Sequence, residues 1–283
     1  MKLHVVLTAA LCLAISCASG HNSDFDSKLP VVRDLAGYNA KLHILTESND
    51  SLQMESIGAV EYPGFRADLY AVRYTPKEIP ERTILITGGV HGNEPAGAGF
   101  TLNLIQALSD GTAAFKNVRV EIIPMINPWG WVHDSRYNYR GMDINRDFAS
   151  FKTQEAKIIG GYVKGRTYDM AIDHHEDPDA SGVYLYQYGR QDTMTARNVL
   201  TAVRDLGFPI EQDVNMIILK TEDGLIDAPM WGLRYMRLTK QLSISNYLRL
   251  ENSTDVYTVE TPVKLPIKDR VEIHELVFGM LSE

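Results

Sequence analysis

The sequence predicts a single α/β domain in which helices flank a mixed, mostly parallel central sheet. Short apolar runs suited to buried strands alternate with amphipathic helical patterns along the chain. The 283 residues are 45% hydrophobic and 23% charged, which is ordinary for a globular domain. No internal repeat, low-complexity tract or Gly/Ser linker divides the chain, so we expect one compact domain over residues 25–283.

Strand and helix patterns follow one another in a regular order. Two runs on either side of Pro63-Gly64 predict a hairpin, and later apolar runs predict buried strands. Apolar residues at helical spacing predict the helices between them. The expected strands are 52–60, 66–74, 83–87, 118–126, 168–173 and 256–260, and the expected helices are 94–108, 154–163, 193–206 and 268–281.

The first twenty residues differ from this pattern. Lys2 is followed by a nearly unbroken apolar stretch over residues 5–15 and then by the small residues Ser16–Gly20. This order predicts a secretory signal peptide over residues 1–20, which is too short for a membrane span. The residues that end at Cys17 resemble a bacterial lipobox, which would leave a lipid-anchored N-terminus, whereas cleavage three residues later would release a soluble domain. We therefore expect an exported protein that is periplasmic or anchored to a membrane.

Composition limits the chemistry that the domain can use. Both cysteines, Cys12 and Cys17, lie in the leader, so the domain has no disulfide and no thiolate metal ligand. Any metal ion must therefore be held by histidine and carboxylate. The formal net charge of −8 argues against a nucleic-acid partner. The sequence does not specify an oligomeric state.

The glycine-rich segment 88–97 places His91 and Glu94 between a strand and a helix. In α/β folds, ligands bind at the carboxyl ends of strands. Zinc accepts histidine nitrogen and carboxylate oxygen, and a catalytic zinc site needs three protein ligands and one open position. The alternative is a plain turn in which Glu94 satisfies the N-terminus of the helix.

His174 and His175 follow the strand 168–173 directly. Neighbouring residues at a strand end point in opposite directions, so at most one of the two is a ligand and the other packs or faces solvent. With His91 and Glu94, one of them completes a set of two histidines and one glutamate, as in known catalytic zinc sites. The alternative is a structural or exposed pair.

A loop over residues 136–148 carries three arginines, Arg136, Arg140 and Arg146, next to Asn145. Guanidinium groups bind carboxylates through paired hydrogen bonds, so this loop is suited to a substrate with a free carboxylate. The alternative is a solvated loop whose arginines pair with local aspartates.

Glu260 stands at the end of the apolar strand 256–260. Burial there raises the pKa of a carboxyl group. Hydrolysis at a metal site needs a base for the attacking water and later an acid for the leaving amine, and such a carboxyl group can serve as both. The alternative is a surface glutamate on an edge strand.

In their order along the chain, these clusters resemble the zinc carboxypeptidase family and its relatives, the aspartoacylase and succinylglutamate desuccinylase deacylases. The resemblance spans roughly residues 50–265. It implies a phosphorylase/hydrolase-like fold with one zinc ion per chain. The motifs that carry it are His91-x-x-Glu94, Asp143-x-Asn145-Arg146-x-Phe148, a later histidine and Thr258-x-Glu260-x-Pro262.

The resemblance also implies a role for each candidate residue. His91, Glu94 and His175 would hold the zinc ion, with His174 as the fallback third ligand. Asn145 and Arg146 would bind the terminal carboxylate of the substrate. Arg136 would polarise the scissile carbonyl, with Arg140 as a weaker candidate, and Glu260 would be the catalytic base.

Three functions follow from these expectations. The first is a metallocarboxypeptidase that acts on peptides, with cell-wall peptides as one candidate class. The second is a deacylase of N-acyl amino acids, although those relatives are usually intracellular and the leader argues against it. The third is a non-catalytic peptide-binding domain, which the intact set of candidate residues argues against.

Overall fold

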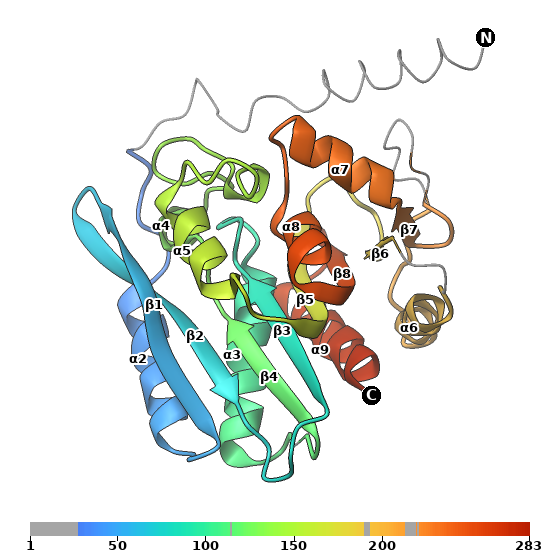
Figure 1. The fold of residues 1–283 in the computed structure, drawn as a ribbon, viewed down its shortest axis with the longest axis horizontal. Coiled ribbons are helices and arrows are strands. Elements are labelled where there is room, and N and C mark those ends of the chain that lie inside the picture. Colours follow the sequence, from blue (N-terminus) through green and yellow to red (C-terminus); the bar gives the residue numbers. More distant parts are fainter. Residues whose placement is uncertain (1–27, 114, 190–192, 213–218, 220) are drawn as a thin grey trace.

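The computed structural model describes residues 28–283 apart from 114, 190–192, 213–218 and 220, and the expected signal peptide with Cys17 lies outside these residues. Strands and helices alternate along the chain, as Figure 1 shows. The strands are β1 (Leu52–Tyr62), β2 (Phe65–Tyr74), β3 (Arg82–Gly88), β4 (Val118–Ile123), β5 (Tyr168–Asp177), β6 (Tyr184–Tyr188), β7 (Leu225–Ala228) and β8 (Ser253–Pro262).

One sheet contains all these strands, in the order β1-β2-β4-β3-β5-β8-β6-β7. The central strands β4, β3, β5 and β8 run parallel to one another, and β6 runs parallel to β7. The pairs β1–β2, β2–β4 and β6–β8 are antiparallel. The predicted α/β domain with a mixed, mostly parallel sheet is therefore confirmed.

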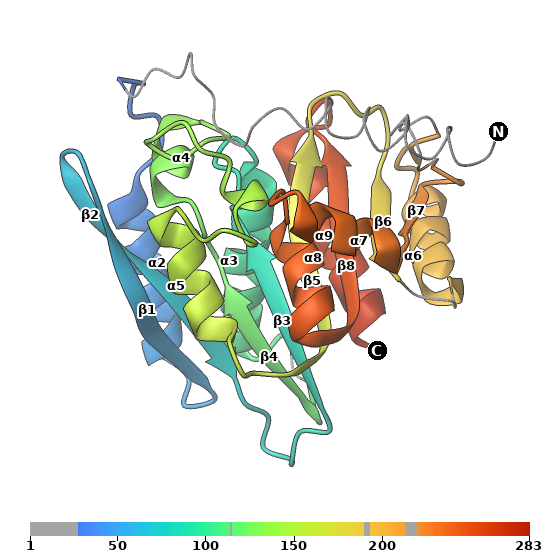
Figure 2. The ribbon, with the colours of Figure 1, turned by 45° about the horizontal axis from the view of Figure 1, so that its top comes forward.

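Helices cover both faces of this sheet (Figure 2). The helices α2, α3, α9 and α6 pack on one face, and α5 and α8 pack on the other. In the described part of the chain, no helix is both long and apolar enough to cross a membrane. The helices are α2 (Leu35–Glu47), α3 (Pro95–Asp110), α4 (Pro128–His133), α5 (Gln154–Val163), α6 (Met194–Asp205), α7 (Met230–Leu238), α8 (Ile244–Glu251) and α9 (Ile267–Ser282), with a 3₁₀ turn at Ile144–Arg146.

Each face of the sheet has its own apolar core, and β5 contributes to both. Met170 and Ile172 pack in the core under α3 and α9, whereas Ala171 packs in the core under α5 and α8. Side chains alternate along a strand, so consecutive residues of β5 enter different surroundings. The same alternation continues to the carboxyl end of the strand, where polar residues follow.

The start of α3 lies directly against β5. A Cβ atom built on Gly97 would stand 2.7 Å from the carbonyl oxygen of His174, which is closer than real side chains approach. Just before the helix, Gly92 is packed against the backbone of Gly130 in α4. Only residues without a side chain fit here, and this close packing fixes the loop between β3 and α3 relative to β5.

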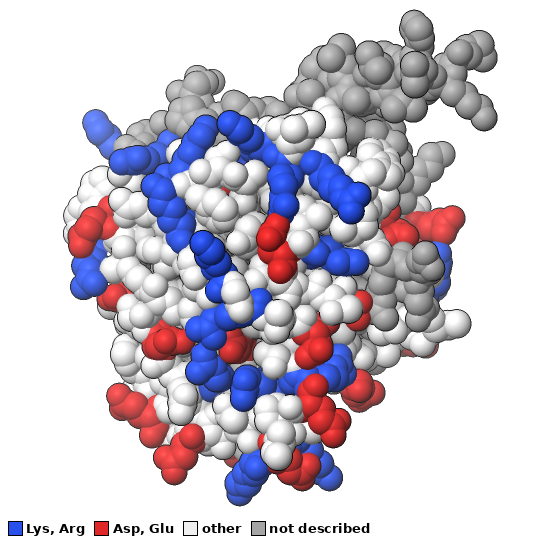
Figure 3. Space-filling view, in the orientation of Figure 1, with Lys and Arg blue, Asp and Glu red and all other residues white. Residues whose placement is uncertain are grey.

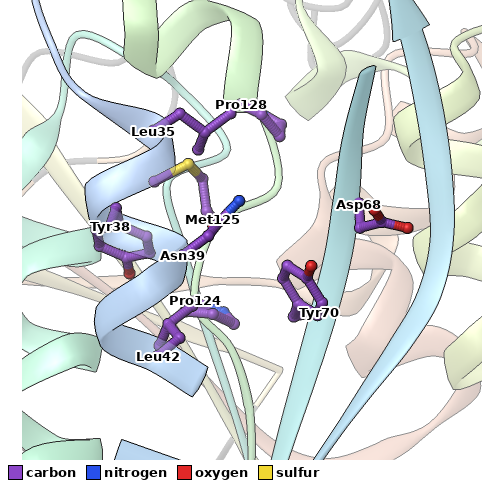
Figure 4. A pocket seen from close by; sticks show the side chains of 9 residues that line it. All are labelled: Leu35, Tyr38, Asn39, Leu42, Asp68, Tyr70, Pro124, Met125 and Pro128. Carbon is purple, nitrogen blue, oxygen red and sulfur yellow. The ribbon is translucent and has the colours of Figure 1, made fainter. Parts of the chain in front are cut away.

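A narrow slot lies between α2 and β2, beside the segment that follows β4 (Figure 4). Its volume is about 10 Å³, which is at most room for one water molecule. The slot is therefore a packing defect rather than a ligand site. Its lining residues are Leu35, Tyr38, Asn39, Leu42, Asp68, Tyr70, Pro124, Met125 and Pro128.

Candidate active site

His91 and Glu94 meet in the connection that leads from β3 into α3. Glu94 is the N-cap residue of α3, but its side chain makes no capping hydrogen bond. Its Oε1 atom lies 2.6 Å from Nδ1 of His91, and its Oε2 atom lies 2.7 Å from Nδ1 of His175. The carboxylate therefore joins two imidazoles, which excludes the simple turn in which Glu94 caps its own helix.

The adjacent histidines of β5 point to opposite faces of the sheet. His175 faces Glu94, while His174 enters the core under α9, where its Nδ1 lies 2.9 Å from Nδ1 of His274 and its ring packs on Phe100. The structure therefore places His175 in the cluster and His174 outside it. The fallback assignment of His174 has no geometric support.

His91, Glu94 and His175 form a group with the geometry of a metal centre. Each offers one ligand atom, and these atoms lie within 4.8 Å of one another. All three side chains are buried. Two imidazole nitrogens and one carboxylate oxygen are a donor set that divalent zinc accepts, so the residues present fit such an ion.

Contacts at the ring nitrogen that faces away from Glu94 hold both imidazole rings in this orientation. Nε2 of His91 lies 3.1 Å from Oδ1 of Asp143, and Nε2 of His175 lies 2.9 Å from Oδ2 of Asp173. A carboxylate on the outer nitrogen of a histidine fixes the ring and raises its basicity toward a metal. Each ring therefore presents Nδ1 to the centre.

The charges in this cluster stabilise one another. Burial alone would raise the pKa of Glu94, but His91 and His175 beside it hold that pKa well below its usual range. Burial also opposes ionisation of Asp143, yet His91, Arg146 and Arg136 hold its pKa below the usual value. Both carboxylates are thus ionised at neutral pH, which a cation site requires.

Arg136 reaches the centre of the cluster from the loop after α4. Its guanidinium group donates to Oδ2 of Asp143 from Nη2 at 2.8 Å and from Nε at 3.1 Å. Its Nη1 atom lies 3.6 Å from Oε1 of Glu94. Arg136 therefore pairs with a local aspartate, as the alternative of a solvated loop expected. The pair lies within the buried cluster, however, and not in a solvated loop.

The other loop residues differ in their distance from the centre. Arg146 is half-buried and donates from Nη1 to the carbonyl oxygen of Asn145 at 2.9 Å. The Arg140 side chain is exposed and lies over the ring of Tyr139, so the structure does not bring it into the cluster.

Asn145 is buried in the 3₁₀ turn and supports the histidine cluster. Its Nδ2 atom lies 3.2 Å from Nε2 of His175, and its Oδ1 atom accepts a hydrogen bond from the backbone N–H of Ile244 in α8. The expectation assigned Asn145 to the carboxylate of the substrate. The structure shows that its amide oxygen already has a partner within the protein.

Glu260 lies beside the cluster on a central strand. β8 is inserted between β5 and β6, and Glu260 pairs in register with His175, so it is not on an edge. Burial, opposed by His175 and aided by the neighbouring carboxylates of Glu94, Asp177 and Asp173, raises the pKa of Glu260 to about 8. A carboxyl group with this pKa exchanges protons near neutral pH.

Several supporting residues were not among the predicted site residues. Asp173 accepts a hydrogen bond from Thr87 at 2.6 Å and from Ser245 at 3.0 Å while it contacts His175. The place of Asp143 inside the Asp-x-Asn-Arg motif was a signal for its importance. No local pattern marked Ser245, because its partner lies far away in the sequence.

Comparison with known proteins finds similarity to hydrolases over part of the chain. The family model of the succinylglutamate desuccinylase/aspartoacylase catalytic domain matches residues 80–218, just under half of the chain. "Carboxypeptidase SOL1" of Arabidopsis thaliana is 32% identical over 93 residues, which are 30% of this chain and 19% of the relative. "Probable carboxypeptidase 2" of Arthroderma benhamiae is 30% identical over 97 residues, 33% of this chain and 18% of the relative. The chain thus spans less than a fifth of these relatives.

Solved structures share the fold over nearly the whole chain. A provisionally assigned metallopeptidase from Shewanella denitrificans superposes with a TM-score of 0.71 at 21% identity and covers 92% of this chain and 96% of its own. A metallo-carboxypeptidase from Burkholderia cenocepacia gives a TM-score of 0.62 at 16% identity over 96% of this chain and 82% of its own. Carboxypeptidase A from Helicoverpa armigera gives a TM-score of 0.64 at 15% identity over 99% of this chain and 79% of its own.

The sheet order, the flanking helices and the His-Glu-His cluster define a carboxypeptidase-like α/β fold. The chain is thus similar over residues 80–218 to the succinylglutamate desuccinylase/aspartoacylase catalytic domain, and it shares its fold with the metallopeptidases above.

Proposed function

We propose that this protein is a zinc-dependent metallocarboxypeptidase that hydrolyses an amide bond next to a free carboxylate in peptides, including cell-wall peptides. One observation carries the proposal. His91, Glu94 and His175 converge from two segments of chain onto one point, and Glu260 stands beside them on the neighbouring strand.

The residues around this point divide the chemistry between them. A zinc ion held by His91, Glu94 and His175 supplies Lewis-acid chemistry, which lowers the pKa of water and polarises a carbonyl group. Glu260 takes a proton from the attacking water and delivers it to the leaving amine, which suits a carboxyl pKa of about 8. Arg136 donates hydrogen bonds to the oxygen of the scissile carbonyl as charge develops there.

Cationic side chains are suited to the free carboxylate of the substrate. Arg146 is anchored through Nη1 to its own loop, close enough to the cluster to lower the pKa of Asp143. Lys and Arg side chains form a band across the upper half of the face in Figure 3, whereas Asp and Glu are concentrated in its lower half. Such a band favours the approach of an anionic substrate, and Arg146 orients it.

A deacylase of N-acyl amino acids is the second candidate. The match of residues 80–218 to the succinylglutamate desuccinylase/aspartoacylase catalytic domain favours it. Both reactions cleave an amide next to a carboxylate and use the same zinc, base and arginine. They differ in the acyl side of the amide, because the peptidase leaves a shortened peptide and the deacylase leaves a short carboxylic acid.

A direct experiment separates these candidates. Purified protein is loaded with zinc, its metal content is measured, and mixed peptides, cell-wall fragments and acylated amino acids are screened by mass spectrometry. Release of C-terminal amino acids selects the peptidase, and release of a short acid selects the deacylase. Glu260→Gln serves as the blank, since it should bind zinc and lose turnover by a factor of about 10²–10⁴. Zinc-loaded protein that binds peptides without turnover, unchanged in Glu260→Gln, would refute both.

We also propose that the protein is exported and that Cys17 carries its lipid anchor. The leader pattern of residues 1–20 is the support for this step. In a bacterial host, the full-length chain should appear in the membrane fraction with the mass of a lipidated N-terminus. Cys17→Ala should move it to the soluble exported fraction, and wild-type protein with an intact leader in the cytoplasm would contradict the proposal.

A further inference from the structure

Glu176 follows His175 in β5 and faces the opposite side of the sheet. Its side chain is buried among β5, α3 and α9. Oε2 accepts a hydrogen bond from the backbone N–H of Ala96 at 2.7 Å, and Oε1 forms an ion pair with Arg270 of α9. The backbone N–H of Glu176 donates to Oε2 of Glu94 at 3.1 Å.

These contacts connect the two segments that bear the candidate metal ligands. Glu94 immediately precedes α3, and Ala96 lies in the first turn of that helix. His175 and Glu176 are neighbours on β5. Glu176 therefore ties the start of α3 to the end of β5, and Arg270 holds the carboxylate of Glu176 from the other side.

Stability alone does not account for such an arrangement. The side chains of Glu176 and Arg270 are only 2% and 9% exposed, and removing two charges from water is costly. Well-packed apolar residues at such positions are often as stable as a buried ion pair or more so. This pair is costly to bury and lies next to the candidate metal ligands. We therefore expect that the site, and not the stability of the fold, requires it.

The surrounding packing leaves little room for adjustment. A Cβ atom added at Gly97 would lie 2.7 Å from the carbonyl oxygen of His174. One added at Gly88 would lie 3.0 Å from the carbonyl oxygen of Gly97. The backbones of β3, α3 and β5 are thus in contact near the cluster. In such a region, a small change in the tie between α3 and β5 moves Glu94 relative to His175.

We propose that Glu176 and Arg270 are positioning residues that hold the carboxylate of Glu94 at the distance from His175 that a divalent cation requires. The inference rests on the proposed metal function and assigns a new role within that site. Neither residue touches the reacting atoms. Their effect is preorganisation, because a ligand set already in place does not have to be ordered when the ion binds.

The test is a double variant that leaves the net charge unchanged. Glu176→Gln/Arg270→Met removes one negative and one positive charge together and keeps an acceptor for Ala96. Its dissociation constant for zinc, measured by competition with a chromophoric chelator, should rise about ten- to hundredfold, as for losses of outer contacts in metal sites. Arg270→Lys keeps the charge pair and should bind zinc nearly as tightly as the wild type.

The matched control is a second buried acid of the same sheet. Glu121 is 4% exposed, lies in β4 and pairs with Arg73 at 3.2 Å. Among the described residues, Glu121 contacts Arg73, Arg166, Tyr162 and Tyr168 and none of the candidate ligands. Glu121→Gln/Arg73→Met should change the unfolding free energy but leave the zinc constant within about twofold of the wild type, since it touches no ligand.

Single variants separate positioning from simple electrostatics. Arg270→Met removes a cation near the site, and Coulomb attraction alone would then tighten zinc binding. Positioning requires weaker binding in both Arg270→Met and Glu176→Gln. The inference is wrong if the two single variants change affinity in opposite directions, or if the double variant binds zinc like the wild type. A wild type that binds no zinc overturns the proposed function itself, which is a distinct result.

Discussion

At the scale of single residues, the site depends on the two nitrogens of each imidazole. In His91 and His175, Nδ1 faces Glu94 while Nε2 contacts Asp143 or Asp173. The outer aspartate keeps a proton on Nε2, which leaves the lone pair of Nδ1 for a metal ion. Although burial opposes protonation of His175, Asp173 and Glu94 raise the pKa of this imidazole well above its usual value.

The adjacent histidines provide a first prediction. His175→Ala should abolish zinc binding, because one of three ligand atoms is lost. His174→Leu should retain one zinc per chain, since His174 faces the core and gives up only its contact with His274, at a cost of about 1 kcal/mol. Elemental analysis of the desalted proteins checks both. Loss of zinc in His174→Leu with retention in His175→Ala would reverse the assignment.

Local sequence marked the clustered candidate ligands better than the residues that support them. His91, Glu94, His175 and Glu260 each stand at or just after the end of a predicted strand, and strand ends meet at one edge of a parallel sheet. Glu176 also follows the predicted strand 168–173, but no local pattern marked its pairing, because its partner Arg270 is 94 residues further along the chain. Its importance depends on which helix packs beneath β5, and periodicity does not specify that.

At the scale of elements, the start of α3 is the feature on which the site depends most. Glu94 immediately precedes this helix, and Gly97 in its first turn lies against the backbone of β5. A side chain at this point has no space to occupy. The helix and the strand would then have to separate, which would move Glu94 away from His175.

We therefore predict that Gly97→Ala weakens both folding and zinc binding. Overpacking of this kind typically costs about 1–3 kcal/mol, and separation of α3 from β5 should raise the zinc dissociation constant. The control is Gly161→Ala in α5, where an added Cβ would meet nothing within 4 Å. There alanine should stabilise the helix by up to about 1 kcal/mol. Denaturant unfolding and zinc titration measure both effects, and equal behaviour of the two variants would contradict the prediction.

The strands with strong apolar runs were predictable, and the short elements were not. The predicted strand 83–87 corresponds to β3, and the predicted helix 268–281 corresponds to α9. By contrast, β6 has only five residues and β7 only four, too few for a clear periodicity. The place of β8 between β5 and β6 comes from long-range pairing, which a single sequence does not encode in any local pattern.

At the scale of the whole molecule, two cores on opposite faces of the sheet stabilise the fold, and one of them contains a buried histidine pair. His274 of α9 is fully buried beside His174 and Phe100. Burial, together with the nearby His175 and Arg270, lowers the pKa of His274 to about 3. The imidazole therefore stays neutral in the folded protein under conditions in which it is protonated in the unfolded chain.

This difference predicts a loss of stability in acid. The unfolded chain takes up a proton at His274 near pH 6.5, whereas the folded protein does so only near pH 3, so the unfolding free energy falls as the pH drops between these values. Each such proton contributes a slope of about 1.4 kcal/mol per pH unit. His274→Leu should reduce the slope measured by urea unfolding between pH 6.5 and 4.5, and the exposed His43→Gln should not. An unchanged slope in His274→Leu would show that another group is responsible.

Removal of the metal ion should also lower the stability of the whole molecule. An ion that binds only the folded state stabilises it by about 2.7 kcal/mol at a concentration one hundred times its dissociation constant. Wild-type protein should therefore unfold at a lower temperature after treatment with a chelator and recover when zinc is returned. The same treatment should leave the unfolding of Glu94→Gln unchanged, since that variant lacks one charged ligand. A wild-type curve that does not respond would argue against a cation at this cluster.

The position of β8 has a consequence for the order in which the sheet is completed during synthesis. This strand is the last of the sheet to emerge from the ribosome, yet it occupies a place between β5 and β6. A nascent chain that has exposed β5 and β6 still lacks the strand that joins them. Glu260 is synthesised only with that strand, so the candidate metal ligands His91, Glu94 and His175 leave the ribosome well before the proposed base.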